Sequence, residues 1–154
     1  MDATTGRRTA ELDALRRRRA ELRESMGVLE RALAAAATGR AVVWGERVHD
    51  ALQAMADDWR EHVIVTEGPG GLHESILAGA LRLANPVSML ADEHELIASD
   101  IAEAIAATQA PVGADDVEPI REQAVGLLSR LSRHRQRGAD LIYEAYATDI
   151  GGGD

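Results

Sequence analysis

Residues 85–105 of the chain read NPVSMLADEHELIASDIAEAI, and the pattern in this stretch recurs along the sequence. Asn85 followed by Pro86 is typical of a helix start, because Asn caps free backbone N–H groups and proline is tolerated in the first turn. Apolar residues then recur every three or four positions, which is the spacing of one helical face. His94 falls on that same face. The stretch therefore predicts an amphipathic helix, ending near Pro111, that carries a histidine on its buried side.

Three other segments repeat this helical spacing, at about residues 9–37, 41–66 and 115–148. Gly39 follows the first segment and can adopt the left-handed conformation that ends many helices. The run EGPGG at residues 67–71 ends the second segment, because proline and glycine both disfavour continuation of a helix. The sequence therefore predicts four long helices joined by connections of defined position.

Two shorter features complete this prediction. Residues 72–84 have the composition of a short extra helix, which we expect to lie across the end of the bundle. Asp115 precedes the last long helix and stands three residues before Glu118, which is the spacing of a capping box. We therefore expect Asp115 to be the N-cap of that helix.

Composition agrees with an all-α fold. Hydrophobic residues make up 45% of the 154 residues, but aromatic residues only 3%, and phenylalanine is absent. Alanine and leucine dominate instead, and both favour helices over strands. Four amphipathic helices with short connections predict an antiparallel up-down-up-down bundle. We expect one domain over residues 1–154, with frayed tails at 1–8 and 149–154.

Charge and the lack of targeting signals restrict the function classes. The net charge is −9, whereas nucleic-acid binding depends on neutralising phosphates with basic residues. No segment approaches the roughly 18 apolar residues of a membrane-spanning helix, and the first residues lack the apolar region of a signal peptide. Without cysteine, disulfides and thiolate chemistry are excluded. We therefore expect a cytoplasmic protein that binds neither nucleic acid nor a membrane.

A run of arginines at residues 16–19 interrupts the apolar stripe of the first helix at Arg19. Residues 1–40 hold nine arginines against six acids, whereas the remainder holds eight against twenty. Such a run can bind an anionic partner, but acids stand four residues to either side of Arg17, at the spacing of helical ion pairs. We interpret the run as a solvated helix face.

The last three long helices each carry one histidine on the apolar stripe: His62, His94 and His134. Counted from the bundle end with the short loops, they lie about 21, 15 and 18 residues deep, or roughly 31, 23 and 27 Å. Three imidazoles at similar depth can share one metal ion or one polar network, since burying them without partners is costly. We expect the other two histidines, His49 and His73, at the surface or rim.

Acidic residues near these histidines bear on the type of metal. Asp58 stands one helical turn before the first histidine, and Glu67 stands shortly after it. Glu93 and Glu95 flank His94 and are expected to point sideways. No serine–histidine–acid set or pair of carboxylates indicates a hydrolase, so a binding protein is favoured over an enzyme.

The histidines lie within longer stretches of recognisable sequence: WREHVIVTEGPGGL at 59–72, LADEHELI at 90–97, LSRLSRH at 128–134 and ADLIYEAY at 139–146. Together these stretches resemble the second, third and fourth helices of hemerythrin-like (HHE cation-binding) domains of the actinobacterial type. The resemblance covers residues 41–148. It implies a four-helix bundle that holds non-heme iron through histidine and carboxylate ligands and that binds dioxygen or another small ligand.

Carried over by position, the resemblance implies His62, His94, His134 and Glu67 as metal ligands. Other family ligands are missing, because the first helix has no histidine and Ala139 and Thr66 stand where acids are expected. A five-histidine di-iron centre therefore cannot be built. A mononuclear site, a carboxylate-rich site and a metal-free structural or protein-interaction bundle all stay open.

Overall fold

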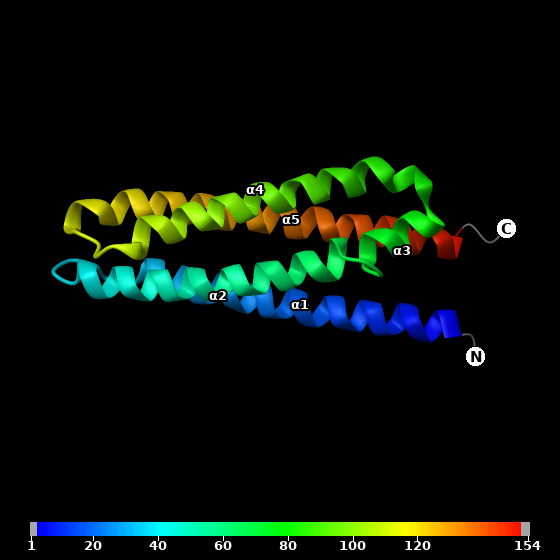
Figure 1. The fold of residues 1–154 in the computed structure, drawn as a ribbon, viewed down its shortest axis with the longest axis horizontal. Coiled ribbons are helices and arrows are strands. Elements are labelled where there is room, and N and C mark those ends of the chain that lie inside the picture. Colours follow the sequence, from blue (N-terminus) through cyan, green and yellow to red (C-terminus); the bar gives the residue numbers. More distant parts are fainter. Residues whose placement is uncertain (1–2, 152–154) are drawn as a thin grey trace.

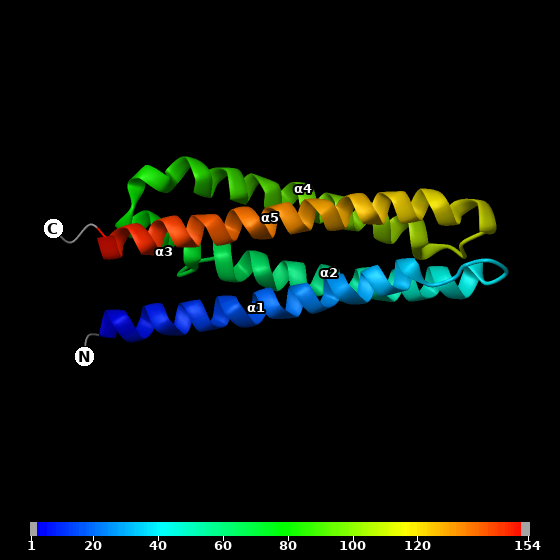
Figure 2. The ribbon, with the colours of Figure 1, turned by 180° about the vertical axis from the view of Figure 1, so that it is seen from behind.

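The computed structural model describes residues 3–151, which form five α-helices and two short 3-10 helices with no strand among them. The four long helices run alternately up and down, and the short α3 lies at the end that holds both termini (Figure 1). Figure 2 shows α1 beside α5 from the opposite side. This arrangement confirms the predicted all-α, antiparallel four-helix bundle with an extra helix. The elements are α1 (Ala3–Ala34), α2 (Ala41–Glu67), α3 (Leu72–Gly79), η1 (Leu81–Leu83), α4 (Ala84–Gln109), η2 (Ala114–Asp116) and α5 (Val117–Gly151).

Both ends of α1 differ from the prediction. Residues 3–8, predicted as a tail, are helical, and the helix ends at Ala34, three residues earlier than expected. An arginine from α5 acts at this C-terminal end. Arg121 donates from Nε to the Leu33 carbonyl at 2.8 Å and from Nη2 to the Ala35 carbonyl at 3.1 Å. Because the last carbonyls of a helix lack partners within it, this contact between helices satisfies two groups that local sequence leaves free.

The predicted N-cap of α4 is wrong. The 3-10 turn η1 leads directly into the helix, so Asn85 lies inside the first turn and Leu83 occupies the cap position without a side-chain hydrogen bond. Pro86 is accommodated there because the first turn does not need its missing N–H group. The preceding 3-10 turn falls within residues 72–84, which we predicted as one short helix, and it sets the start of α4.

The predicted N-cap of α5 is also wrong, because Asp115 lies within the 3-10 turn η2 that precedes the helix. Asp116 Oδ2 accepts a hydrogen bond from the Gly113 backbone N–H at 3.0 Å. This contact caps the 3-10 turn and not α5. At the other end of α5, residues 149–151 are helical instead of frayed, and residues 152–154 lie outside the described part of the chain.

The apolar core consists of two clusters that the histidines separate. The larger cluster fills the end with the short loops and includes Leu22, Leu52 and Leu131. The smaller one lies near α3 and includes Ile76 and Leu141. In α5, for example, the histidine at position 134 stands between the last member of the first cluster and the first member of the second. The polar layer is therefore surrounded by apolar packing along the bundle axis.

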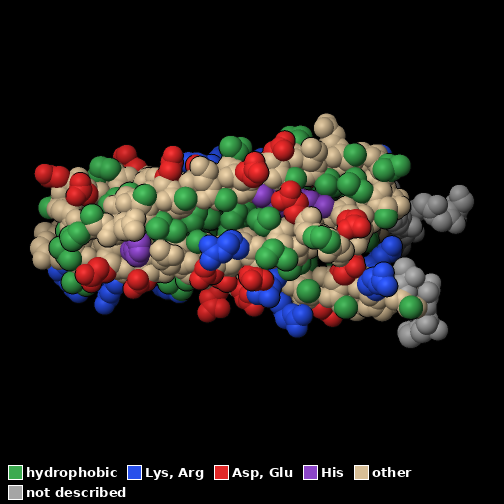
Figure 3. Space-filling model, in the orientation of Figure 1, with side chains coloured by type: hydrophobic (Ala, Val, Ile, Leu, Met, Phe, Trp, Pro, Cys, Tyr) green, Lys and Arg blue, Asp and Glu red, His purple; other side chains and the backbone are tan. Residues whose placement is uncertain are grey.

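Charged side chains cover much of the bundle exterior, and histidine is visible at only a few places on the face in Figure 3. Among the described residues, no helix combines the length and apolar character that crossing a membrane requires.

A substitution at Gly45 on α2 can test how the loop between α4 and α5 packs against that helix. A Cβ at this buried position would overlap the side chain of Val112, which belongs to the larger core cluster. We expect Gly45→Ala to lower the free energy of unfolding by about 1–3 kcal/mol through overpacking. As a control, Gly126→Ala adds a Cβ in ordinary contact, 3.5 Å from Arg130 Nη2, and should stabilise α5 by up to about 1 kcal/mol. Urea denaturation of both variants measures the difference, and equal effects would show that the loop does not pack as described.

Candidate metal centre

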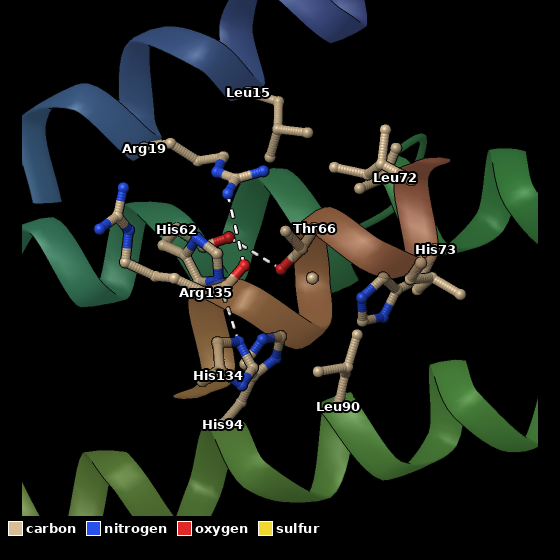
Figure 4. Close-up of a pocket in the computed structure, with 13 residues that line it drawn as sticks. Leu15, Arg19, His62, Thr66, Leu72, His73, Leu90, His94, His134 and Arg135 are labelled. Carbon is tan, nitrogen blue, oxygen red and sulfur yellow. Dashed lines mark hydrogen bonds between the residues drawn. The ribbon is translucent and has the colours of Figure 1, made fainter. Parts of the chain in front are cut away.

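The three predicted histidines meet in the core. His62 from α2, His94 from α4 and His134 from α5 are all buried, and one ring nitrogen of each lies within 4.8 Å of the others. We call these three residues the histidine cluster (Figure 4). The Nε2 atoms of His62 and His134 are 3.4 Å apart. The prediction that the three imidazoles share one level of the bundle is confirmed.

Two carboxylates accept hydrogen bonds from the Nδ1 atoms of histidines in this cluster. Glu67 accepts a hydrogen bond from His94 Nδ1 at 2.7 Å, and Glu93 accepts one from His134 Nδ1 at 2.6 Å. Glu67 therefore contacts Nδ1 of His94. It does not belong to the group of three histidines whose ligand atoms lie close together. Arg137 forms an ion pair with Glu93, which fixes the second carboxylate further.

The position of Glu93 corrects the expectation that it points sideways from the site. It precedes His94 on α4, and the packing of α4 against α5 brings it to the histidine of the neighbouring helix. Spacing along one helix cannot reveal this contact, because it depends on which helices are neighbours. Glu95 is exposed, as expected. Asp58 is not part of the cluster either, since it accepts a hydrogen bond from Ser25 on α1.

The carboxylates determine the tautomers of two imidazoles. Because each carboxylate accepts a hydrogen bond from an Nδ1 atom, His94 and His134 both carry their proton on Nδ1. The Nε2 atom of each ring therefore carries a lone pair. His94 Nε2 is buried and has no hydrogen-bond partner, and the same holds for His62 Nδ1. Buried polar atoms are nearly always paired. The histidine cluster therefore presents unused lone pairs inside an apolar core.

Trp59 forms one wall of the cluster. Its ring stacks on His62 with centroids 4.9 Å apart and meets the rings of His94 and His134 at their edges. Its Nε1 donates to the His94 backbone carbonyl at 3.3 Å. In the sequence, Trp59 falls on the apolar stripe of its helix, three residues before His62. Its position one turn before His62 was the available signal for this contact.

His73 corrects another expectation, since it is buried instead of lying at the rim. Its ring lies parallel to that of His94, with centroids 5.7 Å apart. The tight turn before α3 brings it there. At Gly71, a Cβ would approach three carbonyl oxygens within 2.9 Å, so the turn requires glycine. His49 is half-buried at the other end of the bundle, which agrees with the predicted rim position.

A small cavity of about 20 Å³ adjoins the cluster. Thr66 and His73 line it together with Arg19, whose guanidinium reaches from α1 toward the histidines (Figure 4). Arg19 Nη2 donates to the Arg135 carbonyl at 3.3 Å. The first helix thus contributes an arginine at the level where the other three contribute histidines. A cavity of this size accommodates one water-sized ligand.

The surroundings disfavour protonated imidazoles. Burial, followed by repulsion from His94 and His134, lowers the pKa of His62 from 6.5 to about 3. Burial and repulsion from His94 lower the pKa of His73 to about 4. Burial also lowers the pKa of His134, although its hydrogen bond to Glu93 acts in the opposite direction. Neutral imidazole is the form that binds metal ions, so the surroundings of His62 and His134 favour the ligating form.

No protein-family model matches this sequence, and neither a curated protein nor a solved structure shows significant similarity to it. The resemblance to hemerythrin-like domains is therefore still a prediction from the quoted stretches.

The lowered pKa of His62 predicts acid sensitivity of the metal-free protein. Between about pH 6.5 and pH 3, the His62 side chain is protonated in the unfolded chain but neutral in the folded chain. Stability should therefore fall across this interval as the pH falls. We expect thermal melts of chelator-treated protein to show a smaller pH dependence for His62→Leu than for the native chain between about pH 7.5 and pH 5. An identical pH dependence would contradict the assigned pKa.

Proposed function

We propose that the chain binds a single transition-metal ion through the Nε2 atoms of His62, His94 and His134. The observation that carries this proposal is the buried and partnerless Nε2 of His94, in a cluster where one ring nitrogen of each histidine lies within 4.8 Å of the others. Nitrogen ligands in tetrahedral sites lie about 2.0–2.1 Å from the ion, so two of them are about 3.4 Å apart. The distance between His62 Nε2 and His134 Nε2 is 3.4 Å.

The two carboxylates support the same proposal. Metal-binding histidines usually donate their second ring N–H to a carboxylate, which orients the ring and makes the free nitrogen more basic. Glu67 and Glu93 occupy these positions behind His94 and His134. We therefore assign Glu67 a supporting role in place of the ligand role that the family resemblance implies.

The donor set bears on the number and kind of ions. Three nitrogens converge without a carboxylate among them, which fits one ion better than a carboxylate-bridged pair. Imidazole ligands suit iron, zinc, copper and nickel. Iron is our candidate because of the hemerythrin-like stretches. A site with three protein ligands leaves a coordination position for water or a small ligand such as dioxygen, and the adjoining cavity has the matching size.

A metal-free structural bundle is the second candidate function. The contact between His62 Nε2 and His134 Nε2 favours it, because one neutral imidazole can donate to the other at this position. In that case His94 Nε2 stays buried without a partner, at a cost of about 1–3 kcal/mol. His62 Nδ1 has no partner in either case, because the proposed ion binds the other nitrogen of that ring. Replacement of the histidines by leucine would then be neutral or stabilising.

Metal analysis of the full chain, purified without a histidine tag and reconstituted with iron under anaerobic conditions, distinguishes the two functions. We expect one ion per chain, and we expect His94→Leu and His134→Leu to lose it while remaining folded by circular dichroism. The matched control is His49→Leu, which changes a histidine outside the cluster and should retain the ion. Native protein without bound metal, together with raised melting temperatures in the leucine variants, would refute the metal proposal.

Glu93 provides a sharper test of the supporting carboxylates. Glu93→Gln keeps the size of the side chain but removes the charge that holds His134, and should weaken metal affinity about 10–100-fold. Glu95→Gln makes the same change at an exposed position two residues further along α4 and should leave the affinity unchanged. Competition with a chromophoric chelator measures both. Equal affinities for the two variants would contradict the role assigned to Glu93.

A further inference from the structure

One face of α1 carries a row of arginines. Arg16, Arg19, Arg23 and Arg31 follow one another with Gly27 between the last two, at successive spacings of three, four, four and four residues. These spacings place all five positions on the same helical face. Over the whole row, α1 rises by about 22 Å. The row adjoins the apolar stripe that packs into the core, so it lies where α1 faces its neighbour α5.

The row lines a surface groove of about 540 Å³ between α1 and α5. Arg135 faces it from α5, and Glu24 is the one acidic residue among those that line it. Gly27 also lines this groove, and a Cβ there would be in ordinary contact with Arg31 Nη1, at 3.4 Å. We call this feature the arginine groove, with Arg16, Arg19, Arg23, Arg31 and Arg135 as its basic residues.

Most of these arginines lack an acidic partner. Arg16 pairs with Asp13 at 3.6 Å, whereas the other four form no ion pair within the part of the chain that the structure describes. Burial lowers the pKa of Arg135, and repulsion from Arg19 and Arg23 lowers it further. The positive charges are therefore close enough to repel one another. These arginines lie together in the arginine groove, although the chain as a whole has a net charge of −9 and acids are abundant elsewhere.

The interpretation of residues 16–19 as a solvated face thus holds for part of the run only. Arg16 and Arg18 pair with acids, although three residues away rather than four. Arg19 instead turns into the bundle, where it lines both the arginine groove and the cavity beside the histidine cluster.

We propose that the arginine groove binds a short linear polyphosphate. Guanidinium groups form bidentate, charge-assisted hydrogen bonds with phosphate oxygens, and their arrangement along a helix fits an anion whose charges are also arranged in a line. The groove volume lies within the range of small-ligand sites. Its lining contains no aromatic side chain, so a nucleobase would find no surface for stacking. The phosphate chain alone therefore accounts for the recognition.

Calorimetric titration of the full chain with inorganic tripolyphosphate, in a low-salt buffer without divalent ions, tests this proposal. We expect saturable binding of one anion per chain. The double variant Arg23→Gln/Arg31→Gln should weaken binding by at least about tenfold, because charge-assisted hydrogen bonds are lost. The control Arg40→Gln/Arg47→Gln removes the same charge from exposed positions outside the groove and should change the affinity by less than about twofold.

ATP in place of tripolyphosphate separates a nucleotide from a free phosphate chain. We expect ATP to bind no more tightly, since the groove offers nothing to the base. Three results would each overturn the proposal: no saturable binding of tripolyphosphate, equal weakening by the groove and control variants, or tighter binding of ATP. Because the groove arginines 23 and 31 are exposed, all variants should melt as the native protein does, which circular dichroism verifies.

Discussion

Two hydrogen bonds from buried imidazoles to carboxylates determine the character of this bundle. Glu67 and Glu93 accept from the Nδ1 atoms of His94 and His134, and this leaves both Nε2 lone pairs directed into the core. Apolar clusters pack on either side of this layer along the bundle axis. In the resulting polar centre the Nδ1 atoms of His94 and His134 are paired, whereas His94 Nε2 and His62 Nδ1 have no partner. A metal ion bound at the three Nε2 atoms would supply the missing partner of His94 Nε2, which is why we favour it over a purely structural network.

The fold places this centre without requiring long loops. Each of α2, α4 and α5 contributes one histidine from a rigid helix, and side chains on helices are held more precisely than side chains on loops. The helix α1 contributes Arg19 at the same level, where it closes one side of the cavity. Arg19 and Arg135 also line the arginine groove. The interior site and the surface groove are therefore separated by the same two side chains.

Sequence patterns predicted what depends on helical periodicity. The four long helices, the inward positions of the three histidines and their common depth all follow from a fixed rise and turn per residue. Features that depend on neighbouring helices were missed. Arg121 sets the end of α1 from another helix, Glu93 reaches a histidine on α5, and His73 enters the core because a glycine turn folds α3 back. None of these contacts has a signal in the spacing along one segment.

The position of a bound ion would show whether His62, His94 and His134 together hold a metal. We propose to crystallise the full chain after loading with iron and to collect anomalous diffraction data on both sides of the iron absorption edge. We expect one anomalous peak per chain, about 2.1 Å from the Nε2 atoms of His62, His94 and His134. A peak elsewhere, or a hydrogen bond between His62 and His134 with no peak beside it, would show that the histidine cluster is not a metal site.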